Sequence, residues 1–297
     1  MALKDILVIF DPAHGYATRL AVAAALAELH EAHLTGLCVI PPVSLAEAGL
    51  PLTGGAAESE ALRRVRANLL AVANEATGRI EEALRHEASN RSLACEWRAP
   101  EGRPTELGPL HARYADLCVI GQNDPRHPDA ATGGLVEAVM LSSGRPVVIV
   151  PYAGNFATVG RTILVAWNAT REAARAVNDA LPILERADKV TVLAVNPGTS
   201  GAEKPPVRTV PGIGGEGSWP AADIAHHLAR HGVKAEASYT MSEDVDVGNT
   251  ILSRAADLGA DLIVMGGYGH SRLREFIMGG ATRTLIESMT VPVLLSH

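Results

Sequence analysis

Short apolar runs alternate with longer amphipathic stretches along the whole chain. In the first half, the runs that we expect to be strands lie at residues 6–11, 34–39, 93–97, 117–121 and 146–151. The stretches expected to be helices lie between them, at 17–32, 58–87, 104–114 and 134–143. Strands that are apolar on both sides are typical of a parallel sheet covered by helices on both faces. The first half therefore predicts the order β-α-β-α-β-α-β-α-β.

The second half of the chain repeats this pattern. Its expected strands lie at 163–168, 190–195, 233–239, 261–265 and 291–296, and its expected helices at 170–186, 219–231, 247–258 and 280–289. Four matching pairs of strands follow each other in the same order, with offsets of 157, 156, 145 and 146 residues. Similarity at a nearly constant offset indicates a duplicated unit. We expect one domain at 1–154 and a second at 155–297.

Alternating strands and helices with short joints predict an α/β fold, here as two tandem doubly wound domains with parallel five-stranded sheets. The closing strands at 147–150 and 291–295 are expected to pair antiparallel within one chain. Such pairing covers two open strand edges and makes the chain an internal pseudo-dimer of its two domains. A homodimer is an alternative. Residues 197–220, rich in Gly and Pro, are longer than usual connections and predict a lid or a mobile segment.

Composition narrows the classes of function. The chain has 297 residues, 47% of them hydrophobic, and a formal net charge of −7 with a pI of about 5.9. This acidic chain lacks the basic footprint of nucleic-acid binding, and it has no apolar run of about 18 residues that would span a membrane. Its first residues show no signal-peptide pattern. Cys38, Cys95 and Cys118 lie in apolar runs without a CxxC pair, which predicts reduced, buried thiols in a cytoplasmic protein.

The candidate chemistry lies after the strand that we expect at 261–265. In open parallel sheets, ligands bind outside the carboxyl ends of the strands, where the strand order reverses. Here Gly266 and Gly269 follow the strand, and Gly279 comes just before the last helix. Glycines let backbone N–H groups approach an oxyanion, and a helix N-terminus favours negative charge. The two glycine turns predict a phosphate cradle, although tight strand-to-helix turns would require the same glycines.

These glycines, spaced as Gly266-x2-Gly269-x9-Gly279 and followed by a helix and Val291-Pro292, resemble the universal stress protein family. The resemblance covers nearly the whole chain. The chain is similar to the tandem form of the family, with two such domains in one polypeptide. It implies a Rossmann-like fold of the adenine nucleotide alpha hydrolase type. In the family, the pattern Gly-x2-Gly-x9-Gly-Ser/Thr holds the phosphates and ribose of ATP.

The resemblance implies a set of nucleotide-contacting residues in the second copy. They are Ala166, Trp167, Asn168, Val195, Met265, Gly266, Gly269, His270, Ser271, Arg272, Gly279, Gly280, Ala281 and Thr282. His270 and Arg272 could add positive charge. Two positions depart from the family pattern: Asn168 stands where an Asp contacts the nucleotide, and Gly280 replaces the Ser or Thr that donates to phosphate. Ser271 and Thr282 lie nearby and could replace part of that lost hydroxyl.

The first copy departs further from the family pattern. It keeps Asp11 at the end of its first strand, but Gly121 is followed by Gln122-Asn123-Asp124-Pro125, so the second glycine is missing. A carboxylate then stands where amide donors should meet phosphate. Gly133 and Gly134 precede the next helix at the wrong spacing. We expect the first copy to be degenerate as a nucleotide site and to serve as a structural partner.

Three functions are compatible with these residues. The first is a cytosolic stress protein that binds ATP, with Mg²⁺, or AMP in its second domain as a sensor, with slow ATP turnover at most. The second is a scaffold that binds no nucleotide and works through unknown protein partners. The third is an enzyme of the wider nucleotide-binding superfamily, for which we find no general base and no metal ligands. His227 and His231 share a helical face that can bind zinc, but we expect them to be surface histidines.

Overall fold

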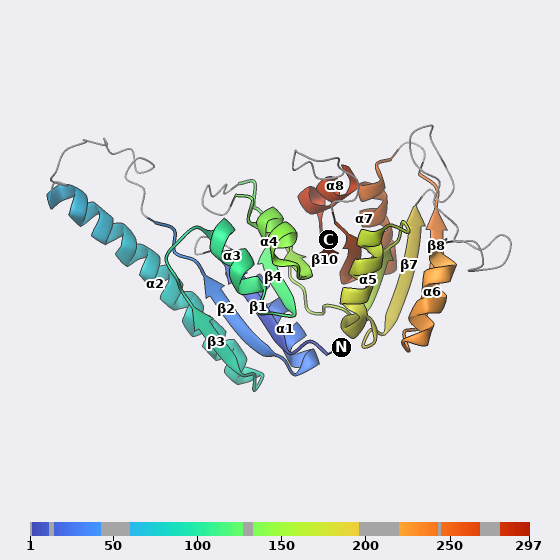
Figure 1. Ribbon diagram of the computed structural model, residues 1–297, viewed down its shortest axis with the longest axis horizontal. Helices are drawn as coiled ribbons and strands as arrows, with labels where there is room; N and C mark the ends of the chain where they lie inside the picture. Colours follow the sequence, from blue (N-terminus) through green and yellow to red (C-terminus); the bar gives the residue numbers. More distant parts are fainter. Residues whose placement is uncertain are drawn as a thin grey trace.

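The computed structural model describes residues 2–11, 15–42, 60–126, 133–195, 220–242, 245–267 and 280–297. In these residues a single twisted sheet lies between two layers of helices (Figure 1). Its ten strands are β1 (Asp5–Phe10), β2 (His33–Cys38), β3 (Cys95–Arg98), β4 (Leu117–Gly121), β5 (Val147–Val150), β6 (Thr162–Ala166), β7 (Lys189–Val195), β8 (Ala235–Thr240), β9 (Leu262–Gly266) and β10 (Val293–Ser296). The alternation predicted from sequence is therefore confirmed.

The strand order is β3-β2-β1-β4-β5-β10-β9-β6-β7-β8. Each half of the sheet is parallel, and the order reverses between β1 and β4 in the first half and between β6 and β9 in the second. The halves meet at β5 and β10, which pair antiparallel through Val148 and Leu294. The predicted edge pairing is thus confirmed, and it joins the two expected five-stranded sheets into one. This pairing covers both edges with main-chain hydrogen bonds.

The helices divide between the two faces of the sheet. They are α1 (Tyr16–His30), α2 (Glu60–Asn90), α3 (Pro104–Ala112), α4 (Leu135–Ser143), α5 (Arg171–Leu184), α6 (Pro220–Arg230), α7 (Val247–Leu258) and α8 (Gly280–Ser288). The core on one face includes residues of α1, α2, α5 and α6, and the core on the other includes residues of α3, α4, α7 and α8. Each core contains residues of both halves of the chain, because the sheet beneath it is continuous.

Small side chains let the helices lie close to the sheet. Ala23, Ala24 and Ala27 of α1 are fully buried, and so are Ala176 and Ala180 of α5. Since aromatic residues make up only 4% of the chain, its core is built mainly from Ala, Val, Leu and Ile. Apolar burial of this kind supplies most of the stabilisation in a folded protein.

Helix α2 is longer than the sheet that it covers. Its 31 residues span about 46 Å, whereas a strand of six residues spans about 20 Å. Ile80 and Leu84, near the middle and end of the helix, are buried against the sheet. Leu69 and Val72, about three and two turns before Ile80, are 42% and 65% exposed. The apolar side of α2 is therefore covered only in its C-terminal part, and the rest extends beyond the sheet (Figure 1).

The three cysteines form no disulfide. Cys38 and Cys118 are buried as predicted, and burial raises the pKa of both thiols. Cys95 differs from the prediction because it is only half-buried, on the strand β3 at the edge of the sheet. The expected lid at 197–220 lies outside the described residues except for Pro220, which begins α6.

Candidate functional site

The sheet register brings several predicted site residues together at one edge. Ala166 at the end of β6 lies opposite Leu193 of β7 on one side and Met265 of β9 on the other. The main-chain N–H of Trp167 donates to the oxygen of Leu193 at 2.8 Å. Val195 ends β7 two residues further along. Ala166, Trp167, Met265 and Val195 thus line the carboxyl edge of the second half of the sheet.

Asn168 shapes the turn that starts α5. Its side-chain oxygen accepts from the main-chain N–H of Thr170 at 3.3 Å and from the Thr170 hydroxyl at 2.9 Å. Thr170 caps the helix in turn, because its Oγ1 accepts from Ala173 N at 3.3 Å. Ala169 between them has a φ of 57°, in the left-handed region. Asn168 therefore supplies the acceptor that this turn needs, without the negative charge that an Asp would bring.

The close approach of α5 explains the first glycine of the motif. A Cβ on Gly266 would lie 2.5 Å from the main-chain N of Ala173 and from the main-chain carbon of Glu172. Any larger residue would push the first turn of α5 away from the end of β9. In the described geometry Gly266 is thus required for helix–strand packing, and its approach to a phosphate stays a prediction.

Glu172 places a buried negative charge beside Gly266. The residue is 6% exposed and pairs with Arg171. Burial alone would raise the pKa of its carboxyl group, but hydrogen bonds from Arg171, the main chain and Thr170 outweigh it, so the pKa is lowered. The carboxylate stays ionised at neutral pH and disfavours an anion at the start of α5. Sequence reasoning assigned Glu172 no role, since only the fold brings it against Gly266.

The start of α8 offers more room. A Cβ on Gly280 would meet no heavy atom of the described residues within 4 Å, and the residue is exposed. Thr282 is buried, at 5% exposure, so its hydroxyl does not lie at the exposed start of the helix. The main-chain oxygen of Ala281 lies close against α7, since a Cβ added to Gly248 of that helix would be only 2.7 Å from it. The exposed main chain at Gly280 is therefore a described helix start with space for a ligand on this edge.

Five predicted site residues lie outside the described residues. They are Gly269, His270, Ser271, Arg272 and Gly279. The phosphate cradle between the two glycine turns accordingly stays a prediction.

In the first half, the equivalent edge holds an ion pair of the protein's own. Arg19 of α1 is 6% exposed, and it donates to the oxygen of Ile9 and to Asp11 Oδ2, both at 2.7 Å. A Cβ on Gly121, the counterpart of Gly266, would overlap the guanidinium group of Arg19. Asp11 is thus engaged with Arg19 instead of standing alone at the strand end. This filling of the edge supports the expectation that the first copy is degenerate.

Each half also contacts the last helix of the other half at this edge. Gln122, next to Gly121, donates its side-chain N–H groups to the main-chain oxygens of Ile286 at 2.7 Å and Glu287 at 3.2 Å. A Cβ on Gly267, the counterpart of Gln122, would lie 2.7 Å from Met140 Cε in α4. The candidate site is therefore supported from both halves of the chain.

Other candidate chemistry finds little support. The rings of His227 and His231 have centroids 4.8 Å apart. No group of three His, Cys, Asp or Glu side chains suited to a metal ion occurs within the described ranges. In the same ranges, no helix combines the length and the apolar character needed to cross a bilayer.

Comparison with known proteins agrees with this geometry. A family model described as the universal stress protein family matches residues 160–297. The crystal structure of a universal stress protein from Archaeoglobus fulgidus superposes with a TM-score of 0.66 and 15% identity, covering 98% of this chain and 96% of that one. A functionally unknown protein from Pseudomonas aeruginosa PAO1 gives a TM-score of 0.57 and 16% identity, with coverage of 99% and 92%. The chain matches no curated protein.

Proposed function

Because residues 160–297 match the model of the universal stress protein family, we propose that this half binds an adenine nucleotide, ATP or AMP, as a sensor or signalling module. The observation that carries the proposal is the open start of α8, which is the helix that follows β9 and the glycine motif. Main-chain N–H groups at a helix start point outwards and carry partial positive charge, which suits phosphate. The match to the family model supports the choice of an adenine nucleotide as the phosphate compound.

The residues around this edge can be given separate roles in the proposal. The main chain near Val195 would contact adenine, and Asn168 would face the ribose through an amide instead of a carboxylate. Gly280 and Ala281 would offer N–H groups to phosphate, together with the glycines at 269 and 279. Mg²⁺ would arrive with ATP, because the described residues provide no cluster of carboxylates to hold it beforehand.

We propose binding without efficient catalysis. The charged groups described at the start of α5 are Arg171 and Glu172, which pair with each other. Because its carboxylate already pairs with Arg171, Glu172 is poorly placed to activate water. The unpaired, buried thiols of Cys38 and Cys118 suit a reducing compartment, and we assign the function to the cytoplasm on that basis.

A second candidate function is a stress-response scaffold that works through protein partners and binds no nucleotide. Three features favour it: the missing hydroxyl at Gly280, the neutral Asn168 and the buried carboxylate of Glu172. The missing hydroxyl and the carboxylate weaken the attraction of this edge for phosphate, and Asn168 departs from the Asp with which the family contacts the nucleotide.

Paired variants at Gly280 test the proposal, because the open space there accepts a side chain without repacking. Calorimetric titration of the full chain with AMP and with MgATP should show binding, with UMP as the matched control. Gly280→Ser restores the family's hydroxyl and should tighten binding about tenfold, the value of one added hydrogen bond to a charged group. Gly280→Glu adds a repelling charge and should weaken it.

The outcomes separate the two candidates. Binding of AMP or MgATP by the natural chain, tightened by Gly280→Ser and weakened by Gly280→Glu, supports the sensor. No binding at millimolar nucleotide by the natural chain contradicts it. If Gly280→Ser then binds nucleotide, the natural site has lost this capacity and the scaffold is favoured.

A further inference from the structure

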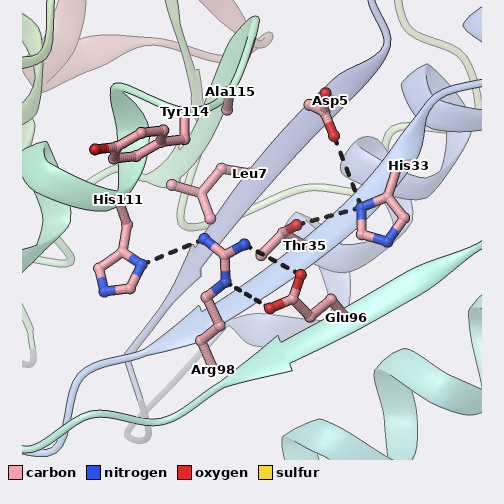
Figure 2. A pocket seen from close by; sticks show the side chains of 9 residues that line it. All are labelled: Asp5, Leu7, His33, Thr35, Glu96, Arg98, His111, Tyr114 and Ala115. Atoms are coloured by element: carbon pink, nitrogen blue, oxygen red, sulfur yellow. Dashed lines mark hydrogen bonds and ion pairs between the residues drawn. The ribbon is translucent and has the colours of Figure 1, made fainter.

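A polar pocket lies on another part of the sheet, in the first half of the chain. It has a volume of about 260 Å³ and lies at the amino ends of β1 and β2 and along β3, on the face that α3 covers (Figure 2). Helix α3 has only nine residues and leaves this corner of the face partly uncovered. The carboxyl edge that carries the candidate nucleotide site is at the other end of the strands. The pocket is therefore a separate place on the molecule.

Strand alternation explains why polar groups gather there. Thr35 of β2 lies opposite Glu96 of β3, and Arg98 comes two residues after Glu96, so all three point to the same face. The residues between them on β3, Cys95 and Trp97, pack against the core of the other face. An edge strand with one polar face thus meets a helix too short to cover it.

Arg98 lies at the centre of the pocket (Figure 2). Its Nε and one terminal nitrogen donate to the carboxylate of Glu96 at 2.8 and 3.1 Å. The other terminal nitrogen lies 3.4 Å from Nδ1 of His111, and this ring nitrogen must accept because guanidinium has only donors. Among the described contacts, three of the five N–H bonds of a guanidinium are used. The two terminal nitrogens point towards Leu7 and Thr35, into the pocket.

Two histidines flank this guanidinium. His111 stands on one side, and burial together with the charge of Arg98 lowers the pKa of its ring. On the other side, Nδ1 of His33 lies 3.4 Å from the hydroxyl of Thr35 and 3.9 Å from Asp5 Oδ1. The ring of His111 can gain a proton when a negative charge arrives beside it.

The second half of the chain provides an internal comparison. The Thr–Glu pair recurs there, since Thr191 lies opposite Glu236 in the same register. The other polar positions change. Asp5, His33, Arg98, His111 and Tyr114 correspond to Thr162, Lys189, Ser238, Ala256 and Gly259. Because both halves share one fold, the fold alone does not require the guanidinium and the two histidines in the first half.

We propose that this pocket binds a small oxyanion, a carboxylate or a phosphate, on the terminal edge of Arg98 between His111 and His33, with uptake of a proton by His111. A planar guanidinium edge matches two oxygens of such a group. Tyr114 lies at the rim of the pocket, and Leu7 contributes an apolar side chain to its lining. The proposal is independent of nucleotide binding in the second half.

The charges facing the pocket set the sign of its pH dependence. Asp5 and Glu96 carry negative charges, Arg98 carries a positive charge, and the lowered pKa of His111 keeps its ring neutral at neutral pH. A further anion adds a second net negative charge, so it binds better once His111 is protonated. The anion raises the pKa of His111 in return, because binding and protonation are linked. Binding should therefore tighten as the pH falls from 7.5 to 6.0.

The test is calorimetric titration of the full chain with malonate and with inorganic phosphate, at pH 6.0 and 7.5, in buffers of different ionisation enthalpy. We expect binding at least about fivefold tighter at pH 6.0, with net proton uptake, as linkage requires. The better probe of the two identifies the ligand as carboxylate or phosphate. Methylammonium serves as the cation control and should not bind.

Variants link the binding to these residues. Arg98→Lys keeps the charge but loses the planar fork, and should weaken binding about tenfold, whereas the exposed Arg85→Lys should change nothing. His111→Gln should remove most of the pH dependence, and the exposed His86→Gln should preserve it. Failure of both anions to bind, binding unaffected by Arg98→Lys, or tighter binding at pH 7.5 would overturn the proposal.

Discussion

The side-chain amide of Gln122 donates to the main-chain oxygen of Ile286 across 2.7 Å, and this bond joins the two halves of the chain. Gln122 is 7% exposed, and its Oε1 also accepts from the main-chain N–H of Tyr152 at 3.1 Å. Ile286 lies in the last turns of α8, whose first residue is Gly280. A residue of the degenerate first motif thus holds the helix that the proposed nucleotide site uses.

Replacing Gln122 by Leu should lower the free energy of unfolding by about 2 kcal/mol. The change leaves buried carbonyl groups of α8 and the N–H of Tyr152 without a partner, and each such loss costs about 1–3 kcal/mol. Urea unfolding measures the effect. The exposed neighbour Asn123 provides the matched control, since Asn123→Ala should change stability by less than about 0.5 kcal/mol. Equal effects of the two substitutions would show that Gln122 does not join the halves.

Substitution by Ala should affect the unfolding free energy very differently at Gly266 and at Gly280. Gly266→Ala places a Cβ 2.5 Å from the main chain of α5, so we expect a loss of about 2–4 kcal/mol in unfolding free energy. Gly280→Ala enters open space, so we expect a change within about 0.5 kcal/mol. Thermal unfolding of both variants gives the comparison. A harmless Gly266→Ala would mean that α5 does not approach β9 as closely as described.

The pair formed by Arg19 and Asp11 should behave as a buried ion pair. Arg19→Met removes the cation and leaves the carboxylate of Asp11 in a largely buried site, so we expect a loss of about 3–5 kcal/mol. Adding Asp11→Leu should recover part of that stability, because the stranded charge is then absent. A double-mutant cycle from urea unfolding measures the coupling. Additive effects of the two substitutions would contradict a coupled pair.

His30 should make the protein sensitive to mild acid. It is 2% exposed at the end of α1, and burial, followed by the charges of Arg186 and Lys4, lowers its pKa from 6.5 to about 4. The unfolded chain binds this proton more readily, so the contribution is complete above pH 6.5 and is lost as the pH falls towards 4. Over the full range the loss is about 3 kcal/mol, at about 1.4 kcal/mol for each pKa unit.

Unfolding free energies at pH 5.0 and 7.5 test this behaviour. His30→Leu should lose about 2 kcal/mol less than the natural chain on acidification, since 1.5 pKa units of the shift lie in that interval. The exposed His86→Leu should behave like the natural chain. An acid response that is unchanged in His30→Leu would assign the sensitivity to other groups.

Much of the architecture could be predicted from the sequence because it depends on local pattern. Apolar runs such as those of β4 and β9 are recognisable without any partner, and the duplication fixes their order. The antiparallel pairing of β5 with β10 followed from two closing strands that each needed an edge. How much of α2 is covered could not be predicted from the sequence. Periodicity shows which side of a helix is apolar, and it does not show how far the sheet beneath the helix extends. Leu69 and Val72 show the consequence.

The candidate site could be predicted only in part. Ala166, Met265 and Gly266 meet as expected, because strand ends of a parallel sheet share one edge. Contacts between distant segments could not be deduced: Arg19 reaches Gly121 across about a hundred residues of sequence, and Gln122 reaches α8 in the other half. The short-range role of Asn168 in its own turn was missed because the resemblance directed attention to a ligand.

Hydrogen exchange of the full chain, followed by mass spectrometry with and without saturating AMP, tests nucleotide binding in the second half most directly. We expect slower exchange in peptides covering 162–168, 262–267 and 280–288, where N–H groups would become occupied or shielded. Peptides covering 5–11 and 117–122 should be unchanged, because Arg19 already fills that edge. Slower exchange confined to the first half, or no change in either half, would contradict the proposed site.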